Sequence, residues 1–573
     1  MKTRRRIPTA FISVFIAAFL VLFSYHYLFH VLFPLHLRPL SPSSFLHNTH
    51  TPSLAIHEHA TSLHGHGSPY PDSILFHDWE VLLVLPHNHA SSSIAGGRSY
   101  KCLFQDGSTS RASPSVVLQS GTRPTFKCRM PFNVRRLRPF FTPSLTLSPA
   151  ASSSAPSGPA APQEMFRWNF LVYDSVSTAD DVIVFAKGIN SRQGTNMPPA
   201  ALRCVFGDGV RTTVTGSAQE VFRCEHPALP FPSGEKVKVS LEMGGEGFSD
   251  RLLPSVALYD PPRRTPAPGA KPALICACTM VYNAAKFLRE WVMYHTSIGV
   301  ERFVLYDNDS DDNIAEVVAK LLEAGYDVTT HVWPWPKTQE AGFSHCAVAH
   351  NDTCTWMMFM DVDEFFFSRS WANASQPSKD MLRSLLTTTT TTTPSSPSSS
   401  PYSPPSPTPS TIGQISMRCY EFGPSNQRSH PKSGVTQGYT CRRRIEERHK
   451  SMVMLDAIDP SLLNVIHHFE LRGGYRARAL SSYQGVVNHY KYQAWPEFKK
   501  KFRRRVSAYV VDWRDAVNPA SKDRTPGLGF AAVEPEGWKQ KFCEVNDSQL
   551  RDLNRRWFGL TSPIGSSRMV WED

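Results

Sequence analysis

The sequence predicts an α/β protein whose main domain is a doubly wound parallel sheet, preceded by a β-rich accessory region and an N-terminal transmembrane helix. Three observations lead to this prediction. Apolar runs alternate with amphipathic helical segments from residue 273 onward, an order typical of parallel sheets. A cysteine-containing, strand-like pattern occurs twice within residues 76–260. A long apolar stretch follows a basic N-terminus.

The N-terminal 37 residues predict an uncleaved signal anchor. Lys2 and three arginines precede a stretch without Asp, Glu, Lys or Arg that extends to Arg38. The apolar segment 10–37 exceeds the roughly 20 residues that span a bilayer. The basic cluster favours a cytosolic tail at 1–9 and a lumenal remainder, a type II orientation. A cleaved signal peptide is the alternative, but its apolar region is usually shorter and no clear cleavage site follows.

A stem and a repeated β pattern come next. Residues 38–75 are rich in Ser, Pro and His and predict a stem, whereas residues 76–260 predict strands. The pattern Cys, apolar, Phe, any residue, Asp-Gly, then Phe-basic-Cys begins at Cys102 and again at Cys204. A cysteine on each of two strands that flank a turn is well placed for a disulfide, so we predict the pairs Cys102–Cys128 and Cys204–Cys224. The chain has 11 cysteines, so at least one is free or pairs outside it.

The α/β domain is predicted at residues 273–560. The continuous apolar run "ALICACTMVY" predicts a strand buried on both faces. A helical pattern ending at Gly299, the strand "RFVLYD", the helix "NIAEVVAKLLEAG" and the strand "YDVTTHVW" follow in that order. The Thr-, Ser- and Pro-rich insertion 387–411 has nothing to bury, so we expect it to be disordered.

Ligands of doubly wound sheets bind outside the carboxyl ends of the strands. Asn283, Asp307 and Asp309 follow strand ends there, and we expect them to bind a nucleotide. This unit contains neither Gly-x-Gly-x-x-Gly nor a Walker A sequence, which argues against a nicotinamide enzyme or a P-loop enzyme. The charge of a diphosphate must therefore be neutralised in another way.

The stretch "WMMFMDVDEFFF" supplies that alternative. "TWMMFM" predicts a buried strand, and Asp361 and Asp363 follow where the strand emerges. Residues i and i+2 of an extended chain point to the same side, so both carboxylates can face one cation. Oxygen ligands suit Mg²⁺ or Mn²⁺, which leave positions open for phosphate oxygens. Such an ion would neutralise a departing nucleoside diphosphate. A solvated strand end is the alternative interpretation.

Four motifs together resemble glycosyltransferase family 92, particularly its plant members. They are "MVYNAAKFLREWVMYHTSIGVERFVLYDNDSDD", "FMDVDEFF", "EFGPSNQRSHPKSGVTQGYTCR" and "NHYKYQAWPEFKKKF". The resemblance implies a GT-A fold, an inverting mechanism and a Golgi membrane location. It also implies transfer of galactose from UDP-galactose into β-1,4 linkages on a cell-wall polysaccharide or glycan acceptor. One departure is "YNA" at Tyr282–Ala284, where related GT-A enzymes often have "RNE".

The same resemblance implies roles for individual residues. Asp363 would be a direct ligand of Mn²⁺ or Mg²⁺, Asp361 would contact ribose or metal-bound water, and Asp307 would contact the nucleoside. GT-A enzymes commonly add a late histidine as a third metal ligand. His489 is preferred because it follows a short apolar strand, and the alternatives are His467 and His468.

An inverting transfer needs a general base, usually Asp or Glu. Glu421 is the first candidate and Glu446 the second. Cys419 and Cys441 bracket the intervening loop and could close it by a disulfide. Arg442, the first of three consecutive arginines, is a candidate contact for the diphosphate, because arginine pairs bidentately with phosphate.

The net charge of +12 suggests either an anionic partner or a solvated basic surface. The expected partners are a membrane, a UDP-sugar donor and a glycan acceptor; no nucleic acid is expected, and a homodimer is left open. A different class of function is a lumenal carbohydrate-binding protein whose transferase domain is inactive. A metal-dependent hydrolase is a weaker alternative, because the residue clusters expected for two metals are sparse.

Overall fold

The computed structural model describes thirteen stretches of the chain. They are residues 71–86, 99–118, 123–148, 163–190, 196–228, 231, 236–245, 248–261, 273–387, 411–465, 467–503, 534–561 and 567–572. The chain divides into two compact units, Met1–Ser62 and Leu63–Asp573, and every described residue belongs to the second. The predicted tail and membrane anchor, nearly all of the stem and nearly all of the 387–411 insertion lie outside these residues. Within the described stretches, no helix is both long and apolar enough to cross a membrane.

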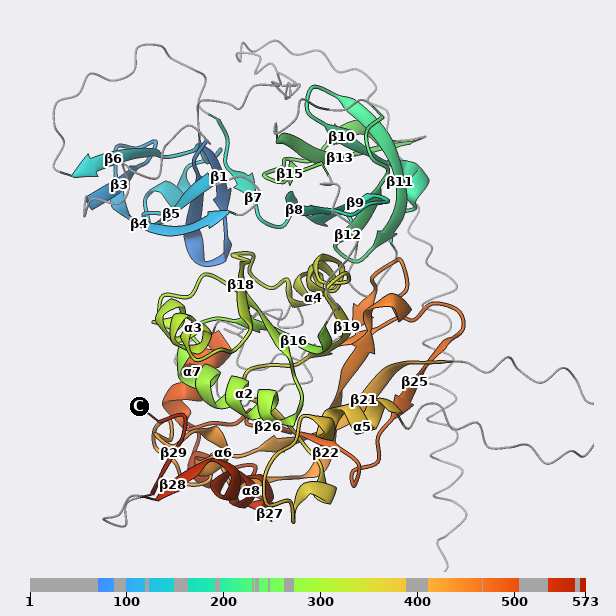
Figure 1. The fold of residues 1–573 in the computed structure, drawn as a ribbon. Coiled ribbons are helices and arrows are strands. Elements are labelled where there is room, and N and C mark those ends of the chain that lie inside the picture. The colour runs from blue at the N-terminus through green and yellow to red at the C-terminus, as the bar shows by residue number, and fades with distance from the viewer. Residues whose placement is uncertain are drawn as a thin grey trace, which may run out of the picture. The chain divides into compact units, whose positions relative to one another are not determined.

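The first β-module is a seven-stranded sheet in the order β6-β3-β4-β5-β2-β1-β7 (Figure 1). Its strands are β1 Asp72–Leu75, β2 Glu80–Val84, β3 Ser99–Leu103, β4 Thr109–Leu118, β5 Arg123–Arg129, β6 Ser144–Ser148 and β7 Phe166–Arg167. The apolar sequence of β2 is buried along most of its length, because one face packs on the module's own core and the other on the neighbouring cluster.

The second β-module repeats this topology in the order β14-β13-β10-β11-β12-β9-β8, with β15 added beside β13. Its strands are β8 Leu171–Ser177, β9 Val182–Lys187, β10 Leu202–Phe206, β11 Val210–Ala218, β12 Val221–Cys224, β13 Val237–Gly245, β14 Phe248–Leu252 and β15 Leu258–Tyr259. Strands β3, β4, β5 and β2 of the first module thus correspond to β10, β11, β12 and β9 of the second.

Both predicted disulfides of the repeat are confirmed. Cys102–Cys128 connects β3 with β5, and Cys204–Cys224 connects β10 with β12. The surroundings differ from the expected hairpin, because a whole strand, β4 or β11, lies between the two cysteine strands and pairs with both. The repeated unit is therefore a three-stranded meander closed by one disulfide.

The third part is a mixed α/β domain around a ten-stranded sheet in the order β18-β17-β16-β19-β22-β21-β26-β20. Its strands are β16 Ala273–Val281, β17 Arg302–Asp307, β18 Val328–Val332, β19 Cys354–Phe359, β20 Glu364–Phe367, β21 Thr411–Phe422, β22 Cys441–Met454, β25 Tyr475–Ala479, β26 Val486–His489 and β27 Val545–Asn546. Short pairs are β23 Asn464–Val465 with β24 His468–Phe469, and β28 Gly559–Thr561 with β29 Ser567–Met569. Its helices are α2 Ala285–Ile298, α3 Ile314–Glu323, α4 Gln339–Ala349, α5 Asp380–Thr387, α6 Val435–Gly438, α7 Trp495–Arg503 and α8 Gln549–Phe558.

Strands β16 to β19 are parallel, as the apolar runs predict, and the switch to antiparallel pairing occurs between β19 and β22. Helices α2 and α3 pack on one face, together with Ile275, Ala277 and Val281 of β16. Helix α4 packs on the other face with Cys276 and Cys278, where residues of the second β-module join the same core. In Figure 1, α2 lies below β16 and α4 lies above it.

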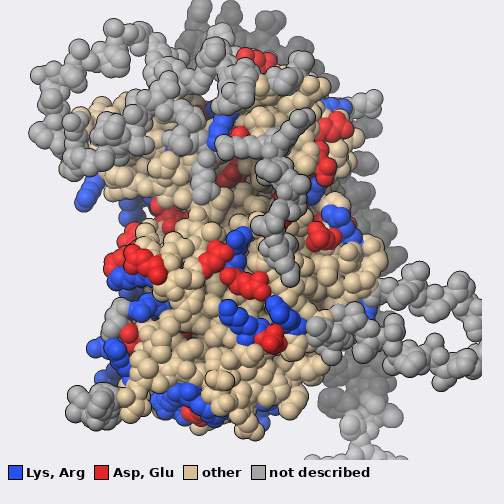
Figure 2. Space-filling view, viewed as in Figure 1, with Lys and Arg blue, Asp and Glu red and all other residues tan. Residues whose placement is uncertain are grey.

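Charges are mixed on the molecular face that Figure 2 shows. Lys and Arg side chains lie among Asp and Glu side chains there, without one continuous basic area. The net charge of +12 is therefore not concentrated over this face, where it would otherwise indicate a polyanion-binding surface.

Candidate active site

Three potential metal ligands converge where strand β19 ends. Asp361 and Asp363 follow β19 directly, and β20 then pairs antiparallel with β26 so that Glu364 lies opposite His489. Carboxylate oxygens of the two aspartates and a ring nitrogen of His489 lie within 4.8 Å of one another. His489 Nε2 is 3.7 Å from Asp363 Oδ1. We call these three residues the acidic edge cluster.

The acidic edge cluster fits a divalent cation by the chemistry of its donors. Two carboxylates and one imidazole provide oxygen and nitrogen ligands, a set that suits Mn²⁺ and leaves positions for other oxygens. Asp363 is only 2% exposed, and a buried carboxylate is costly without a positive partner. The three residues come from two chain segments about 130 positions apart, so the fold itself creates the site.

Neighbouring side chains orient the first aspartate. Gln339, in the first turn of α4, donates from Nε2 to Asp361 Oδ1 at 3.1 Å. Lys450 of β22 places Nζ 3.5 Å from Asp361 Oδ2 and 2.6 Å from Glu364 Oε1. Glu364 also accepts the backbone N–H of Asp361 through Oε2 at 2.9 Å. Asp361 is therefore held by residues of α4, β22 and β20.

Gln493 supports the second aspartate by donating from Nε2 to Asp363 Oδ2 at 3.3 Å. Its other side-chain bond is to the carbonyl oxygen of Tyr490, at 2.9 Å. The backbone N–H of Tyr490 bonds to the carbonyl oxygen of Asp363 at 2.9 Å. This segment directly after β26 therefore fixes both the chain and the side chain of Asp363.

Electrostatic coupling surrounds Lys450. Burial raises the pKa of Glu364 well above its usual range, and the neighbouring Asp361 carboxylate raises it further. Burial lowers the pKa of Lys450, but the carboxylates of Glu364 and Asp361 outweigh this and raise it overall. His467 lies with Nε2 2.7 Å from Lys450 Nζ, and burial followed by the lysine charge brings the pKa of His467 well below its usual range. A neutral imidazole has an acceptor nitrogen, so His467 can accept a hydrogen bond from the ammonium of Lys450.

Of the three candidate histidines, the structure brings only His489 into the cluster. His467 contacts Lys450 instead. His468 in β24 places Nε2 3.1 Å from the carbonyl oxygen of His449.

The expected nucleoside contacts lie at the ends of the neighbouring strands. Asp307 ends β17, beside Val281 of β16, and its Oδ1 accepts both the backbone N–H and the hydroxyl of Ser310, at 3.0 and 2.6 Å. Burial raises the pKa of Asp307. Asn283 has a positive φ of 50° and accepts the backbone N–H of Asp311 at 2.8 Å. These hydrogen bonds give the loops after β16 and β17 a fixed shape.

Asp309 has a different environment from the one expected. Its carboxylate forms an ion pair with Lys127 of β5 and accepts the hydroxyl of Ser115 at 2.9 Å. Both partners belong to the first β-module, so Asp309 serves in the contact between that module and the ten-stranded sheet. This contact argues against Asp309 as a nucleotide ligand.

The two candidate general bases, Glu421 and Glu446, have different surroundings in the structure. Glu421 in β21 lies beside His489 in the parallel register of β21 and β26. Its Oε1 is 2.5 Å from Lys491 Nζ and its Oε2 is 3.2 Å from Arg443 Nη1. Glu446 in β22 instead pairs with Arg418 and accepts the hydroxyl of Tyr420 at 2.9 Å. Of the two, Glu421 is the one placed beside the acidic edge cluster.

One further expectation for this region, the Cys419–Cys441 disulfide, is wrong. Cys441 pairs with Cys543, not with Cys419, which is buried and free. The register explains this, because Cys419 lies opposite Glu447 in the β21–β22 pair. Arg442 is buried and bonds through Nε to Asp547 Oδ2 at 2.6 Å, with its guanidinium 3.9 Å from the centroid of the Tyr420 ring. These contacts anchor Arg442 and β22, and a contact of Arg442 with the diphosphate stays a prediction.

Sequence reasoning missed the supporting residues Gln339, Lys450 and Gln493. It also missed two disulfides of β16: Cys276–Cys354 connects it with the parallel strand β19, and Cys278–Cys346 connects it with helix α4. The spacing of Cys276 and Cys278 was an available signal, because cysteines at i and i+2 of a strand share one face. No comparable local signal marks Lys450, since a lysine in a strand is usually solvated.

Comparison with known proteins agrees with the motifs. Residues 271–523 match the model of the family described as glycosyltransferase family 92. A glycosyltransferase family 92 protein of Oryza sativa subsp. japonica is 39% identical over 507 residues, which cover 83% of this chain and 81% of the relative. The chain belongs to glycosyltransferase family 92. Another family 92 protein, from Ricinus communis, is 37% identical over 521 residues, covering 87% of this chain and 85% of the relative.

Solved structures are more distant from this family 92 chain. A mannosyltransferase from Pyrobaculum calidifontis, in complex with GDP-mannose and Mn²⁺, is 12% identical with a TM-score of 0.25. That likeness covers 45% of this chain and 69% of the mannosyltransferase. This structural similarity is too low to support an argument about the site. The description of the site rests on the residues of this chain.

Proposed function

We propose that this family 92 glycosyltransferase transfers galactose from UDP-galactose, with inversion and in β-1,4 linkage, to a cell-wall polysaccharide or glycan. The observation that carries the proposal is the convergence of Asp361, Asp363 and His489 at the carboxyl end of β19. This is the edge of a doubly wound sheet where ligands bind. The choice of galactose and of the linkage comes from the family resemblance.

The residues of the site would have separate roles in cation binding and in the support of Asp361. Asp363 and His489 would hold a divalent cation, Mn²⁺ or Mg²⁺, with Asp361 beside them. When bound, the cation supplies positive charge to the diphosphate leaving group. Gln339 and Lys450 keep Asp361 in place, so little reorganisation is needed on donor binding.

Donor and acceptor are then positioned by different strands. Asp307 and Asn283, after β17 and β16, would contact the nucleoside of UDP. The acceptor hydroxyl forms a bond to the anomeric carbon of galactose while the bond to UDP breaks, and Glu421 would take the hydroxyl proton. Lys491 and Arg443 hold the Glu421 carboxylate in this position.

A Golgi location as a single-pass type II membrane protein is also part of the proposal. It rests on the basic residues and apolar segment of residues 1–37. Protease protection of intact Golgi vesicles tests the orientation, because the catalytic domain should survive until detergent is added. Digestion of the catalytic domain in sealed vesicles would contradict it.

The decisive experiment measures sugar transfer by purified full-length protein in detergent. It uses a panel of UDP-sugars with β-galactan oligosaccharides, with Mn²⁺ or with chelator. Asp363→Asn should lower turnover by about 10²–10³-fold, the usual effect of removing one electrostatic partner of the transition state. Asp352→Asn is the matched control, because Asp352 is an exposed aspartate just before β19, at the strand's opposite end.

Galactose transfer that needs both Mn²⁺ and Asp363 supports the proposal. Transfer of another sugar with the same requirements would replace galactose and keep the site. Transfer that persists in Asp363→Asn or in chelator would overturn the metal site. Oligosaccharide binding without transfer of any sugar would instead favour a carbohydrate-binding protein.

A further inference from the structure

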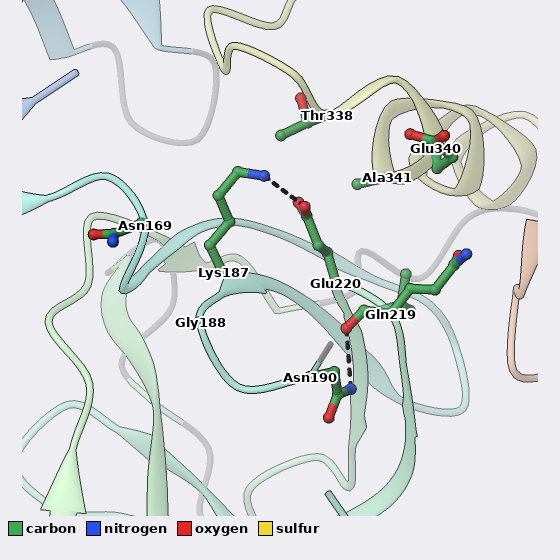
Figure 3. A pocket seen from close by; sticks show the side chains of 10 residues that line it. Asn169, Lys187, Gly188, Asn190, Gln219, Glu220, Thr338, Glu340 and Ala341 are labelled. Atoms are coloured by element: carbon green, nitrogen blue, oxygen red, sulfur yellow. Dashed lines mark hydrogen bonds and ion pairs between the residues drawn. The ribbon is translucent and has the colours of Figure 1, made fainter. Parts of the chain in front are cut away.

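A second, partly open pocket lies between the second β-module and helix α4. It is a cavity of about 180 Å³ (Figure 3). Its lining residues are Asn169, Lys187, Gly188, Asn190, Gln219, Glu220, Val221, Thr338, Glu340 and Ala341. We call it the α4 cavity. None of the three acidic edge residues lines it, so it is separate from the site described above.

The walls of the α4 cavity are fixed by internal bonds. Lys187 Nζ lies 2.5 Å from Glu220 Oε1, and Glu220 Oε2 accepts the hydroxyl of Tyr173 at 2.8 Å. Asn190 donates from Nδ2 to the carbonyl oxygen of Gln219 at 3.0 Å. Figure 3 shows both dashed contacts on the β-module side, facing the residues of α4. The polar groups are therefore preorganised, which lowers the cost of binding.

The opposite wall is tied to the module across the cavity. Gln219 donates from Nε2 to the carbonyl oxygen of Asn464 at 2.8 Å. Asn464 in turn donates from Nδ2 to the carbonyl oxygen of Glu340 at 3.0 Å and to the hydroxyl of Ser344 at 2.9 Å. This chain of bonds keeps α4 and the β-module at a constant separation and holds the cavity open.

The lining selects the chemistry of a ligand. It offers donors from Lys187 and Asn190 and acceptors from Glu220 and Glu340, together with the exposed amide of Asn169. Two carboxylates against one ammonium disfavour an anion. A hydroxyl both donates and accepts, so a neutral polyhydroxylated molecule can satisfy both kinds of group.

The volume of the α4 cavity also restricts the ligand. The volume of about 180 Å³ lies below the roughly 300–1,000 Å³ of pockets that bury drug-sized ligands, and it suits a unit of about one sugar ring.

We propose that the α4 cavity binds one neutral sugar unit of a glycan, at a site distinct from the transfer centre. The first turn of α4 is common to both sites, because Glu340 lines the cavity while the adjacent Gln339 contacts Asp361. A glycan held here would be retained close to the catalytic sheet without occupying the donor site. The inference depends on the proposed function only for the choice of glycan probe.

Isothermal titration of the full-length protein with β-1,4-galactotetraose and with free galactose tests the inference, in chelator and without donor. Lys187→Met removes the charged donor and should weaken binding about tenfold or more, as for hydrogen bonds to charged groups. Lys236→Met is the matched control, because Lys236 pairs with Asp260 in the same module but does not line the cavity. Asn169→Leu, at an exposed lining position, covers the case in which Lys187→Met does not fold.

Binding that survives Asp363→Asn and Lys236→Met but weakens in the cavity variants supports the inference. Binding lost in Asp363→Asn and retained in Lys187→Met or Asn169→Leu would place the glycan at the transfer centre and overturn it. Absence of binding to both probes would mean that the cavity holds only water. Transfer activity is not measured, so a failure of the proposed function is distinguishable from a failure of this one.

Discussion

Acidic side chains are used in two different ways at the two boundaries of the catalytic sheet. At the carboxyl edge, Asp361 and Asp363 converge with His489 on one point. At the contact with the β-modules, Asp309 and Asp174 each have their own partner: Asp309 pairs with Lys127, and Asp174 accepts the indole N–H of Trp335 at 2.8 Å.

The difference lies in what assembles each group. Strand ends impose the convergence, since the turn after β19 and the register of β20 with β26 fix all three ligands together. The boundary contacts are separate from one another: Asp309 contacts Lys127 and Ser115, and Asp174 contacts Trp335. Removing one residue should therefore damage the acidic edge cluster as a unit and the boundary only locally.

The largest effect on stability is expected at Lys450. Lys450→Met removes the ammonium that contacts Asp361 and Glu364. Both carboxylates then lack this positively charged partner. Removing one partner of a buried ion pair typically destabilises a protein by about 3–5 kcal/mol. Urea unfolding measures this, with Lys320→Met as control, because Lys320 is in an exposed i,i+4 pair on α3. Equal stability of the two variants would show that the network around Lys450 is not cooperative.

Substitution of Glu421 tests whether a general base lies beside the acidic edge cluster. Glu421→Gln should lower turnover by about 10²–10⁴-fold, the usual contribution of a general base, with UDP affinity unchanged. Glu447→Gln is the control, because Glu447 also pairs with Arg443 but lies outside the acidic edge cluster. Turnover within a factor of about three of wild type would remove Glu421 from the role and leave it an ion-pair partner.

The sequence predicted the parts of this site that depend on short patterns. The strands β16, β17 and β19 were recognisable as apolar runs, and the i, i+2 spacing identified Asp361 and Asp363. His489 was predicted from its place at a strand end together with the family resemblance. Each of these inferences needs information from only a few adjacent residues.

Features that depend on distant packing were not predictable. Helix α4 is buried on nearly all sides between the sheet and the second β-module, so it lacks the polar face by which surface helices are recognised. The Cys441–Cys543 pair spans 102 residues, and spacing alone could not select it. Lys450 is buried because β22 places its side chain against Asp361 and Glu364. No local sequence pattern reveals this contact.

At the boundary, Asp174 predicts a pH dependence of stability. Burial raises its pKa to about 6, although the Trp335 bond and Arg123 oppose this. In the unfolded chain this carboxyl has the ordinary aspartate pKa of 3.8, so the folded state binds more protons between about pH 4 and 6. Stability should therefore fall as pH rises through this window, by about 1–2 kcal/mol because the residue is not completely buried.

Asp174→Asn keeps an acceptor for Trp335 and removes the titration. Its melting temperature relative to wild type should therefore rise between pH 4.5 and 7. Asp180→Asn, at an exposed position close in the same module, should show a constant difference. If both variants follow wild type across this range, the Asp174 carboxylate is not coupled to folding.

The smallest effect is expected for the ion pair between Lys127 and Asp309. Lys127→Met also removes a 3.3 Å contact with Glu80, but the lysine side chain is 21% exposed and thus partly screened. We expect a loss of about 1 kcal/mol in the free energy of unfolding, near the upper end for exposed pairs. Lys101→Met, on an exposed face of the same module, is the control. Because the contacts at this boundary are separate, the changes in the free energy of unfolding caused by Lys127→Met and Asp174→Asn should add within about 0.5 kcal/mol. A larger coupling would show that the boundary, like the acidic edge cluster, acts as one unit.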